Sequence, residues 1–391
     1  MNTAVGTLAP PARKKAIAAG IPWTVWACTL ASASIAVGLY WDISWHMSIG
    51  RDTFWTPAHL LIQFGGVITA AVCGWTIFGA TFRPDSELRQ NSVTVLGFRG
   101  PLGAFIASWG GLAMVTSAPF DNWWHDAYGL DVKILSPPHV LLALGIAGIV
   151  WGGLILTVAA MNRAEDIQKR HLQWLLLVLG GLAVLHSMVP RLEYLNKAFL
   201  HSSSAYLTLG IGLLLVIEAP ARASGHRWGR TIMTGIYSLF VLLMLWILPL
   251  FPATPKLGPV YQPITHMVPL PFPILLIVPA FVLDLVWPRA KYWPQWRQAL
   301  FAGAVFMAVM ITVEWPFASF LMSPAARNWF FHPANFPFFE PAESASVRFV
   351  FRQMDHSAMQ FWRNMGLAFA SSVLSMWVGI VFGNWLRRVR R

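Results

Sequence analysis

Two stretches of the sequence carry metal-binding residue types at matching intervals: WDISWHMSIGRDTFWTPAHLLIQFGG (41–66) and FDNWWHDAYGLDVKILSPPHVLLALGI (120–146). In each, an aspartate and a histidine stand four residues apart, and a second histidine follows a Ser/Thr-Pro pair. Carboxylate oxygens and imidazole nitrogens are common ligands of divalent transition metals. The candidate ligands are Asp42, His46 and His59 in the first stretch and Asp121, His125 and His139 in the second.

The spacing predicts how helices position these side chains. Residues i and i+4 project from one face of a helix, so each Asp-x3-His pair can contact one ion. Thr56 and Ser136 are good N-cap residues followed by proline, which places the second histidine in the first turn of the next helix. Asp52 and Asp131 could each accept a proton from a histidine ring and fix its orientation.

The near-fixed spacing predicts an internal two-helix repeat. A single histidine at a membrane boundary is usually structural, but carboxylates near hydrocarbon are costly and favour a functional interpretation. Two histidines and one carboxylate suit Fe(II), Zn(II) or Cu(II), so the residues alone leave copper, iron and zinc open. A b-type haem held by His46 and His125 is an alternative, although it leaves the aspartates without a role.

The composition indicates a membrane protein. The chain has 391 residues, of which 56% are hydrophobic, and 21 tryptophans, too little polar surface for a soluble globule. Apolar runs of about 20 residues predict about ten transmembrane helices in an all-α polytopic fold. They lie near 22–45, 56–82, 100–119, 137–161, 172–189, 199–220, 230–251, 271–288, 298–321 and 365–386.

The basic residues predict the orientation. Nineteen of the 28 Lys and Arg residues fall in alternate connections and at the termini, which predicts that both termini are cytoplasmic. The net charge of +12 then reflects topology, and no nucleic-acid partner is expected. Nine of the 11 histidines fall near the opposite helix ends. We expect a multi-pass protein of the cytoplasmic (inner) membrane, in contact with lipid, with metal sites facing the periplasm or exterior.

Five regions follow from this pattern. We expect a cytoplasmic tail at 1–21, a duplicated metal-binding four-helix unit at 22–165 and additional helices at 166–321. An external loop at 322–364, which could cover the outer face, precedes a last helix and basic tail at 365–391.

Several further polar residues have expected roles. His186 and His201 could form a degenerate third metal site, and Glu314 and Asp355 are expected in salt bridges near the outer face. Near the cytoplasmic face, we expect Glu218 and Asp284 to pair with nearby arginines, Arg222 and Arg289 respectively.

The first stretch resembles the C subunits of the copper membrane monooxygenases, the family of particulate methane monooxygenase and ammonia monooxygenase. WHMSIGRDTFWTPAH is similar to the W-H-x4-R-D-T-x2-[TS]-P-x-H pattern of those proteins, and Asp42 completes the family's Asp, His, His copper site. In the second stretch, His125, Pro137 and His139 match a neighbouring site whose first ligand is usually Asn, where this chain has Asp121. The resemblance covers roughly residues 25–165, and some six further helices follow it.

The resemblance implies a copper-dependent monooxygenase, or a component of one, that oxygenates a small substrate with dioxygen. It also implies other membrane subunits, and a homo-oligomer is the alternative assembly. The competing hypothesis is a non-enzymatic copper-binding protein for uptake, delivery or sensing. Because the first stretch keeps the whole pattern, we expect it to hold the tighter ion, and the second, more anionic set to hold the exchangeable one.

Overall fold

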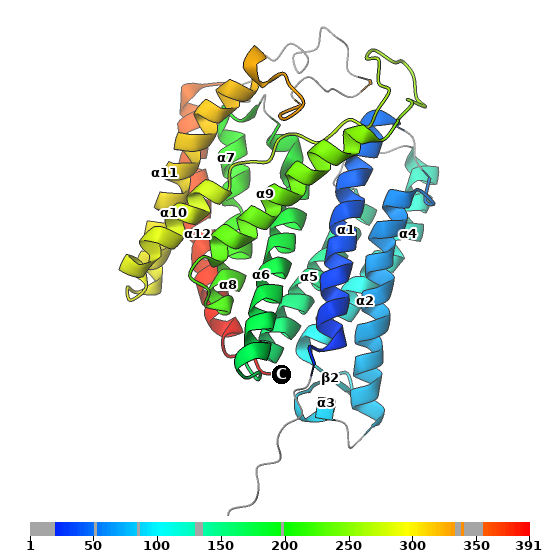
Figure 1. The fold of residues 1–391 in the computed structure, drawn as a ribbon, viewed down its shortest axis with the longest axis vertical. Helices are drawn as coiled ribbons and strands as arrows, with labels where there is room; N and C mark the ends of the chain where they lie inside the picture. Colours follow the sequence, from blue (N-terminus) through cyan, green and yellow to red (C-terminus); the bar gives the residue numbers. More distant parts are fainter. Residues whose placement is uncertain are drawn as a thin grey trace, which may run out of the picture.

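A computed structural model of the chain describes residues 20–50, 53–83, 87–129, 136–196, 199–332, 338–339 and 355–391. Within these ranges, nine helical segments are long and apolar enough to cross a membrane (Figure 1). Sheet is confined, in the same ranges, to one short two-stranded hairpin. The chain is therefore an all-α, multi-pass membrane protein.

The first half is built from four long helices and a small connecting hairpin: α1 (Trp23–Ser48), α2 (Pro57–Phe82), α3 (Glu87–Gln90), β1 (Val93–Val95), β2 (Phe98–Gly100), α4 (Leu102–Tyr128) and α5 (Pro137–Met161). Helix α1 packs on α2, α2 on α4, and α4 on α5. Because α5 also packs on α1, the four helices close into one unit whose apolar core includes Val25, Ile62, Met114 and Ile149.

Glycines allow the helices of this unit to approach closely. A Cβ atom at Gly110 would lie 2.5 Å from the carbonyl oxygen of Gly145, and one at Gly111 would lie 2.5 Å from that of Gly66. A side chain at either position would collide with the backbone of the neighbouring helix. The small residues therefore hold α4 tightly between α5 and α2, as small residues do in membrane bundles.

The second half contains the remaining described helices: α6 (Asp166–Met188), η1 (Val189–Tyr194), α7 (Ser203–Gly210), α8 (Leu213–Ser224), α9 (Gly229–Ile247), η3 (Leu248–Leu250), α10 (Ile277–Ala290), α11 (Gln295–Leu321), η4 (Pro324–Ala326) and α12 (Ala358–Leu386). Helix α6 joins the two halves, since it packs on α1 and α5 as well as on α8 and α9. Helix α12 packs against α7, α8 and α11.

Two sequence expectations about helices need correction. The apolar run 199–220 forms two helices, because the backbone is extended at Ile211 and left-handed at Gly212, where φ is +75°. The run 271–288 is helical only from Ile277, which leaves a 14-residue helix and accounts for nine spans among the described residues instead of about ten. Prolines at 269, 271 and 273 keep the preceding chain extended, since proline lacks an amide hydrogen and disfavours helix at the residue before it.

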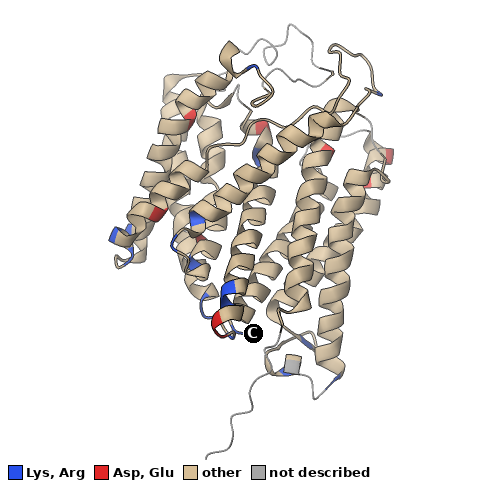
Figure 2. Ribbon diagram, viewed as in Figure 1, with Lys and Arg blue, Asp and Glu red and all other residues tan. Residues whose placement is uncertain are grey.

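The charges are distributed unevenly along the bundle. Lys and Arg residues gather at the end where the chain terminates, which is opposite to the ends of α1 and α4 that carry the candidate ligands (Figure 2). This agrees with the alternation of basic connections in the sequence. The expected tail 1–21 falls largely outside the described residues, and so do residues 333–337 and 340–354 of the expected external loop 322–364.

Candidate metal centre

The first set of candidate ligands comes together at the junction of α1 and α2. Asp42 and His46 lie on the last turns of α1, and His59 is the third residue of α2. The distance from Asp42 Oδ1 to His59 Nε2 is 3.2 Å, and that from Asp42 Oδ2 to His46 Nε2 is 3.8 Å. One ligand atom from each of the three residues lies within 4.8 Å of the others, so a single ion could contact all three.

The start of α2 places His59. Thr56 occupies the N-cap position with extended backbone angles, and Pro57 is the first helical residue, as the sequence predicted. The Thr56 side chain, however, makes no capping hydrogen bond. Its hydroxyl is buried and has no hydrogen-bond partner within the described ranges, and the same holds for the Ser136 hydroxyl at the start of α5.

The carboxylate of Asp42 has the character of a metal ligand. Its Oδ1 atom is buried and, in the part of the chain that the structure describes, meets no donor in hydrogen-bonding geometry, even though His59 Nε2 lies 3.2 Å away. The side chain of Asp42 is 19% exposed, whereas that of His46 is 49% exposed. A buried carboxylate oxygen needs a positive partner or a hydrogen bond. A cation between this oxygen and the imidazole nitrogens would supply one, so the residues present fit a divalent ion.

The second set is assembled in the same way from α4 and α5. Asp121 Oδ2 lies 3.5 Å from His125 Nε2, and Asp121 Oδ1 lies 3.6 Å from His139 Nε2. The Nδ1 atom of His125 lies 3.2 Å from the carbonyl oxygen of Gly129, which orients the ring and leaves Nε2 facing the carboxylate. Among the described residues, only the Asp42 set has all three ligand atoms within 4.8 Å of one another. The Asp121 set is therefore the more open of the two.

Three residues named from the sequence motif fall outside the described part of the chain. These are Arg51 and Asp52 after the first Asp-x3-His pair and Asp131 after the second. The expectation that the two aspartates orient histidine rings stays a prediction.

A segment far along the chain covers the end of α1. The Ser44 hydroxyl donates to the carbonyl of Val268 at 2.6 Å, and the Val268 amide donates to the Ser48 hydroxyl at 2.7 Å. Earlier in the same segment, the Lys256 amide donates to the carbonyl of Ile49, the residue that follows α1. We call these hydrogen bonds between the end of α1 and residues 256–268 the clasp. The sequence did not predict it, because nothing in the sequence indicates which distant residue a serine in an apolar run will bond. The expected cover, 322–364, contributes Phe338, which is buried and whose carbonyl accepts from the amide of Tyr261 in the same segment.

The two histidines considered for a third site have other partners. His186 Nε2 lies 3.1 Å from the carbonyl oxygen of Ser32, and His201 Nε2 lies 3.1 Å from the Ser319 hydroxyl. Burial lowers the pKa of His201, so its ring is neutral at physiological pH. The described residues thus bring His186 and His201 to different helices instead of to one ion.

The carboxylates expected in outer salt bridges are also bound differently. Glu314 Oε2 accepts from the Leu275 amide at 3.0 Å, and Asp355 accepts from the amide and hydroxyl of Ser203. In the described part of the chain neither forms an ion pair with a Lys or Arg, and Arg348 and Arg352, which precede Asp355, lie outside that part. The expected salt bridges stay predictions.

A buried ion-pair network occupies the opposite end of the bundle. Glu218 pairs with Arg222 at 2.9 Å, as expected, and with Arg230 at 2.7 Å. Asp284 pairs with Arg230 at 2.8 Å, where the sequence had predicted Arg289. Arg230 starts α9 and lies nearer in space because α9 packs on both α8 and α10. The network neutralises itself and ties three helices together.

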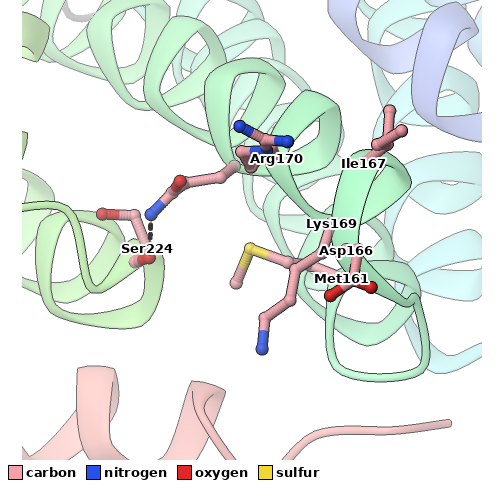
Figure 3. A pocket seen from close by; sticks show the side chains of 7 residues that line it. Met161, Asp166, Ile167, Lys169, Arg170 and Ser224 are labelled. Carbon is pink, nitrogen blue, oxygen red and sulfur yellow. Dashed lines mark hydrogen bonds between the residues drawn. The ribbon is translucent and has the colours of Figure 1, made fainter.

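A surface hollow of about 610 Å³ lies near that end, beside the start of α6 and the end of α8, and Figure 3 shows the side chains that line it. It is lined by Met161, Asp166, Ile167, Lys169, Arg170, Gln173 and Ser224. Its basic side chains, Lys169 and Arg170, are exposed and lie near the start of α6. The hollow shares no residue with the candidate ligands, so it does not serve the metal centre.

Comparison with known proteins adds no support to the resemblance to the copper membrane monooxygenases, which rests on the motif residues alone. The chain matches no model of a known protein family, and no solved structure matches it.

Proposed function

We propose that this membrane protein binds a copper ion through Asp42, His46 and His59, and a second, more weakly held ion through Asp121, His125 and His139. The observation that carries the proposal is the convergence of the first three ligand atoms within 4.8 Å, contributed by two helices. Three protein ligands leave coordination positions open, as in sites that react with a further molecule.

We further propose that the site oxygenates a small substrate, with the chain acting alone or beside other membrane subunits. This step is supported by the resemblance of residues 41–59 to the monooxygenase pattern. Bound copper would supply the redox chemistry for activating dioxygen. The side chains of this chain hold the ion from the α1–α2 side, and the half-exposed His46 leaves its other side accessible.

Metal analysis of the purified protein tests the first proposal. We expect close to two copper ions per chain in wild type, and electron paramagnetic resonance signals with nitrogen coupling from histidine. An Asp42→Ala, Asp121→Ala double variant should lose both. Iron or zinc at the same positions would contradict copper while retaining the site, and an unchanged metal content in the double variant would exclude these ligands.

The second candidate function is copper uptake, delivery or sensing without catalysis. The 49% exposure of the His46 side chain favours it, because an accessible ligand permits exchange of the ion with a partner. Labelled dioxygen distinguishes the two functions: incorporation of the label into a small substrate by copper-loaded membranes supports oxygenation. Transfer of copper to an external chelator without incorporation supports delivery. Adjacent genes for proteins like the A and B subunits of the copper membrane monooxygenases would support oxygenation. Adjacent genes for copper chaperones would support uptake, delivery or sensing.

A further inference from the structure

The second half of the bundle contains non-helical backbone within its apolar core. Between Phe251 and Leu276 the chain has almost no regular secondary structure, yet Leu270, Ile274 and Leu276 are buried. Backbone amides in such a segment have no helical acceptor and must find one elsewhere, since lipid offers none. Two side chains serve them: the Ile274 amide donates to the Tyr237 hydroxyl, and the Leu275 amide donates to Glu314.

This hydrogen bond engages only one of the two carboxyl oxygens of Glu314. Glu314 is 1% exposed, its Oε2 atom accepts from Leu275 at 3.0 Å, and its Oε1 atom is buried with no hydrogen-bond partner among the described residues. No Lys or Arg of the described residues lies within ion-pairing distance. Glu218 is equally buried but has two arginines within 2.9 Å. An ionised carboxylate in the surroundings of Glu314 would have no compensating charge.

The elements packed around Glu314 contribute phenols and indoles. Tyr206 on α7 stacks on Trp315 with ring centroids 6.2 Å apart, and its buried hydroxyl has no partner among the residues that the structure describes. Tyr237 reaches the same backbone segment from α9. The neutral ring of His201 lies 4.6 Å from Trp315, one residue beyond Glu314. These groups carry no charge that would hold Glu314 ionised.

Charged groups on the same elements are engaged or distant. Arg191, beside α7, donates to the carbonyls of Thr208 and Ile211, where α7 ends. Arg363 on α12 is exposed. The ion-pair network that includes Asp284 contacts α11 through a hydrogen bond from Arg222 to Gln298. Gln298 precedes Glu314 by 16 residues, or about 24 Å of helix, so this network is far from Glu314.

We propose that Glu314 is a proton-binding site. In the resting protein the carboxyl group is neutral, with Oε2 accepting from the Leu275 amide and the proton on Oε1. Uptake adds one proton from the aqueous phase to the carboxylate and release returns it, with no other reactant. A metal cation would need several more oxygen ligands than the one carboxylate and the phenols here provide. The site lies at the end of the bundle that carries the candidate metal ligands, but it does not depend on them.

Infrared spectroscopy of the purified full-length protein tests the proposal. At neutral pH we expect a carbonyl stretching band from a protonated carboxylic acid, and the Glu314→Gln variant should lose it. Gln is the shape of the neutral acid, so the variant should keep the thermal stability of the wild type. Glu193→Gln, at an exposed glutamate, should leave the band unchanged. If Glu314→Gln retains the full band, the proposal is wrong.

Chemical modification gives a second readout that needs no variant. A hydrophobic carbodiimide adds to a protonated carboxyl, the O–H adding across a C=N bond without a leaving group, and the adduct is mapped by mass spectrometry. We expect labelling at Glu314, with none at Glu218 or Asp284, which are ionised in their pairs with arginine. Equal labelling of Glu218 and Glu314, in protein shown to be folded, would overturn the distinction between them.

Discussion

The carboxylates at the two ends of the bundle differ in the side chains that face them. At one end, Asp42 and Asp121 lie 3.2 to 3.8 Å from histidine nitrogens on two helices and remain 19% and 27% exposed. At the other end, Glu218 and Asp284 are completely buried and lie 2.7 to 2.9 Å from guanidinium nitrogens. Both arrangements place acids between helices within a membrane protein, where an acid is costly.

The two kinds of carboxylate differ in whether their oxygens are already taken up by hydrogen bonds or can still bind a cation. A guanidinium donates several hydrogen bonds in a fixed plane and is always charged. Arginines occupy both oxygens of Glu218 and one oxygen of Asp284, whose other oxygen accepts from the amide and hydroxyl of Thr231. A neutral imidazole presents one lone pair and leaves the carboxylate free to share a cation. The arginine-bound acids are accordingly structural, and the histidine-facing acids are candidates for ligand binding.

Replacing Arg230 should have the largest effect. Arg230→Leu leaves Glu218 and Asp284 buried beside too little positive charge, and removing one partner of a buried ion pair typically costs about 3–5 kcal/mol. Thermal unfolding in detergent should show a strongly lowered midpoint. Arg227→Leu, at an exposed arginine nearby, should change the free energy of unfolding by less than about 1 kcal/mol. Similar losses in both variants would remove the contrast between the two ends.

Asp42→Ala should abolish tight metal binding with little loss of stability. A direct ligand contributes more than the groups that orient it, whose loss typically costs 10–100-fold in metal affinity, so we expect a loss on the order of 100-fold or more. Calorimetric titration of the metal-free protein with copper measures this loss. Asp126→Ala removes an exposed acid next to His125, and its tight binding should be unchanged. A tight phase that survives Asp42→Ala would refute the assignment.

Asp121→Ala should have a smaller effect, confined to the weaker phase of the same titration. The Asp121 set is more open, so we expect a decrease of roughly 10-fold or more in the weak affinity and none in the tight one. Wild-type weak binding should also fall as the pH is lowered, because the ligands must be deprotonated to hold the ion. Loss of the tight phase in Asp121→Ala would reverse the order of the two sets.

Gly129→Ala should have the smallest effect. Gly129 has φ of +88°, which a side chain disfavours, and its carbonyl oxygen orients the His125 ring. A shift of that carbonyl should weaken the second set by up to about 10-fold. Gly97→Ala is the matched control, because Gly97 has φ of +85° in the hairpin between α2 and α4, with nothing near its Cβ position. Equal effects on copper binding would indicate backbone strain instead of ring orientation.

Sequence reasoning succeeded where local patterns decide the structure. The apolar run 137–161 coincides with α5, because Ser136 and Pro137 mark its start and continuous apolar residues fill its length. Asp42, His46 and His59 lie together because a helix end and a following N-cap fix their positions within the one junction. These features depend on residues close in sequence.

Sequence reasoning failed where packing between distant elements decides. Gly212 interrupts an apolar run whose mean hydropathy is that of a single transmembrane helix. Hydropathy carries no information on backbone angles, so it does not predict a residue with left-handed backbone. Asp284 pairs with Arg230, 54 residues away along the chain, because α9 and α10 lie side by side, and not with the closer Arg289. The internal repeat and the membrane orientation stay predictions.

The clasp between α1 and the segment before α10 has a consequence for biosynthesis. Ser44 and Ser48, on the helical turns that carry Asp42 and His46, bond to Val268, which leaves the ribosome more than 200 residues later. At translation speeds of about 5–20 residues per second, the end of α1 waits on the order of ten seconds or more for this partner. The ligand-bearing turns thus reach their final packing only after most of the helices have been synthesised, which places metal loading late in assembly.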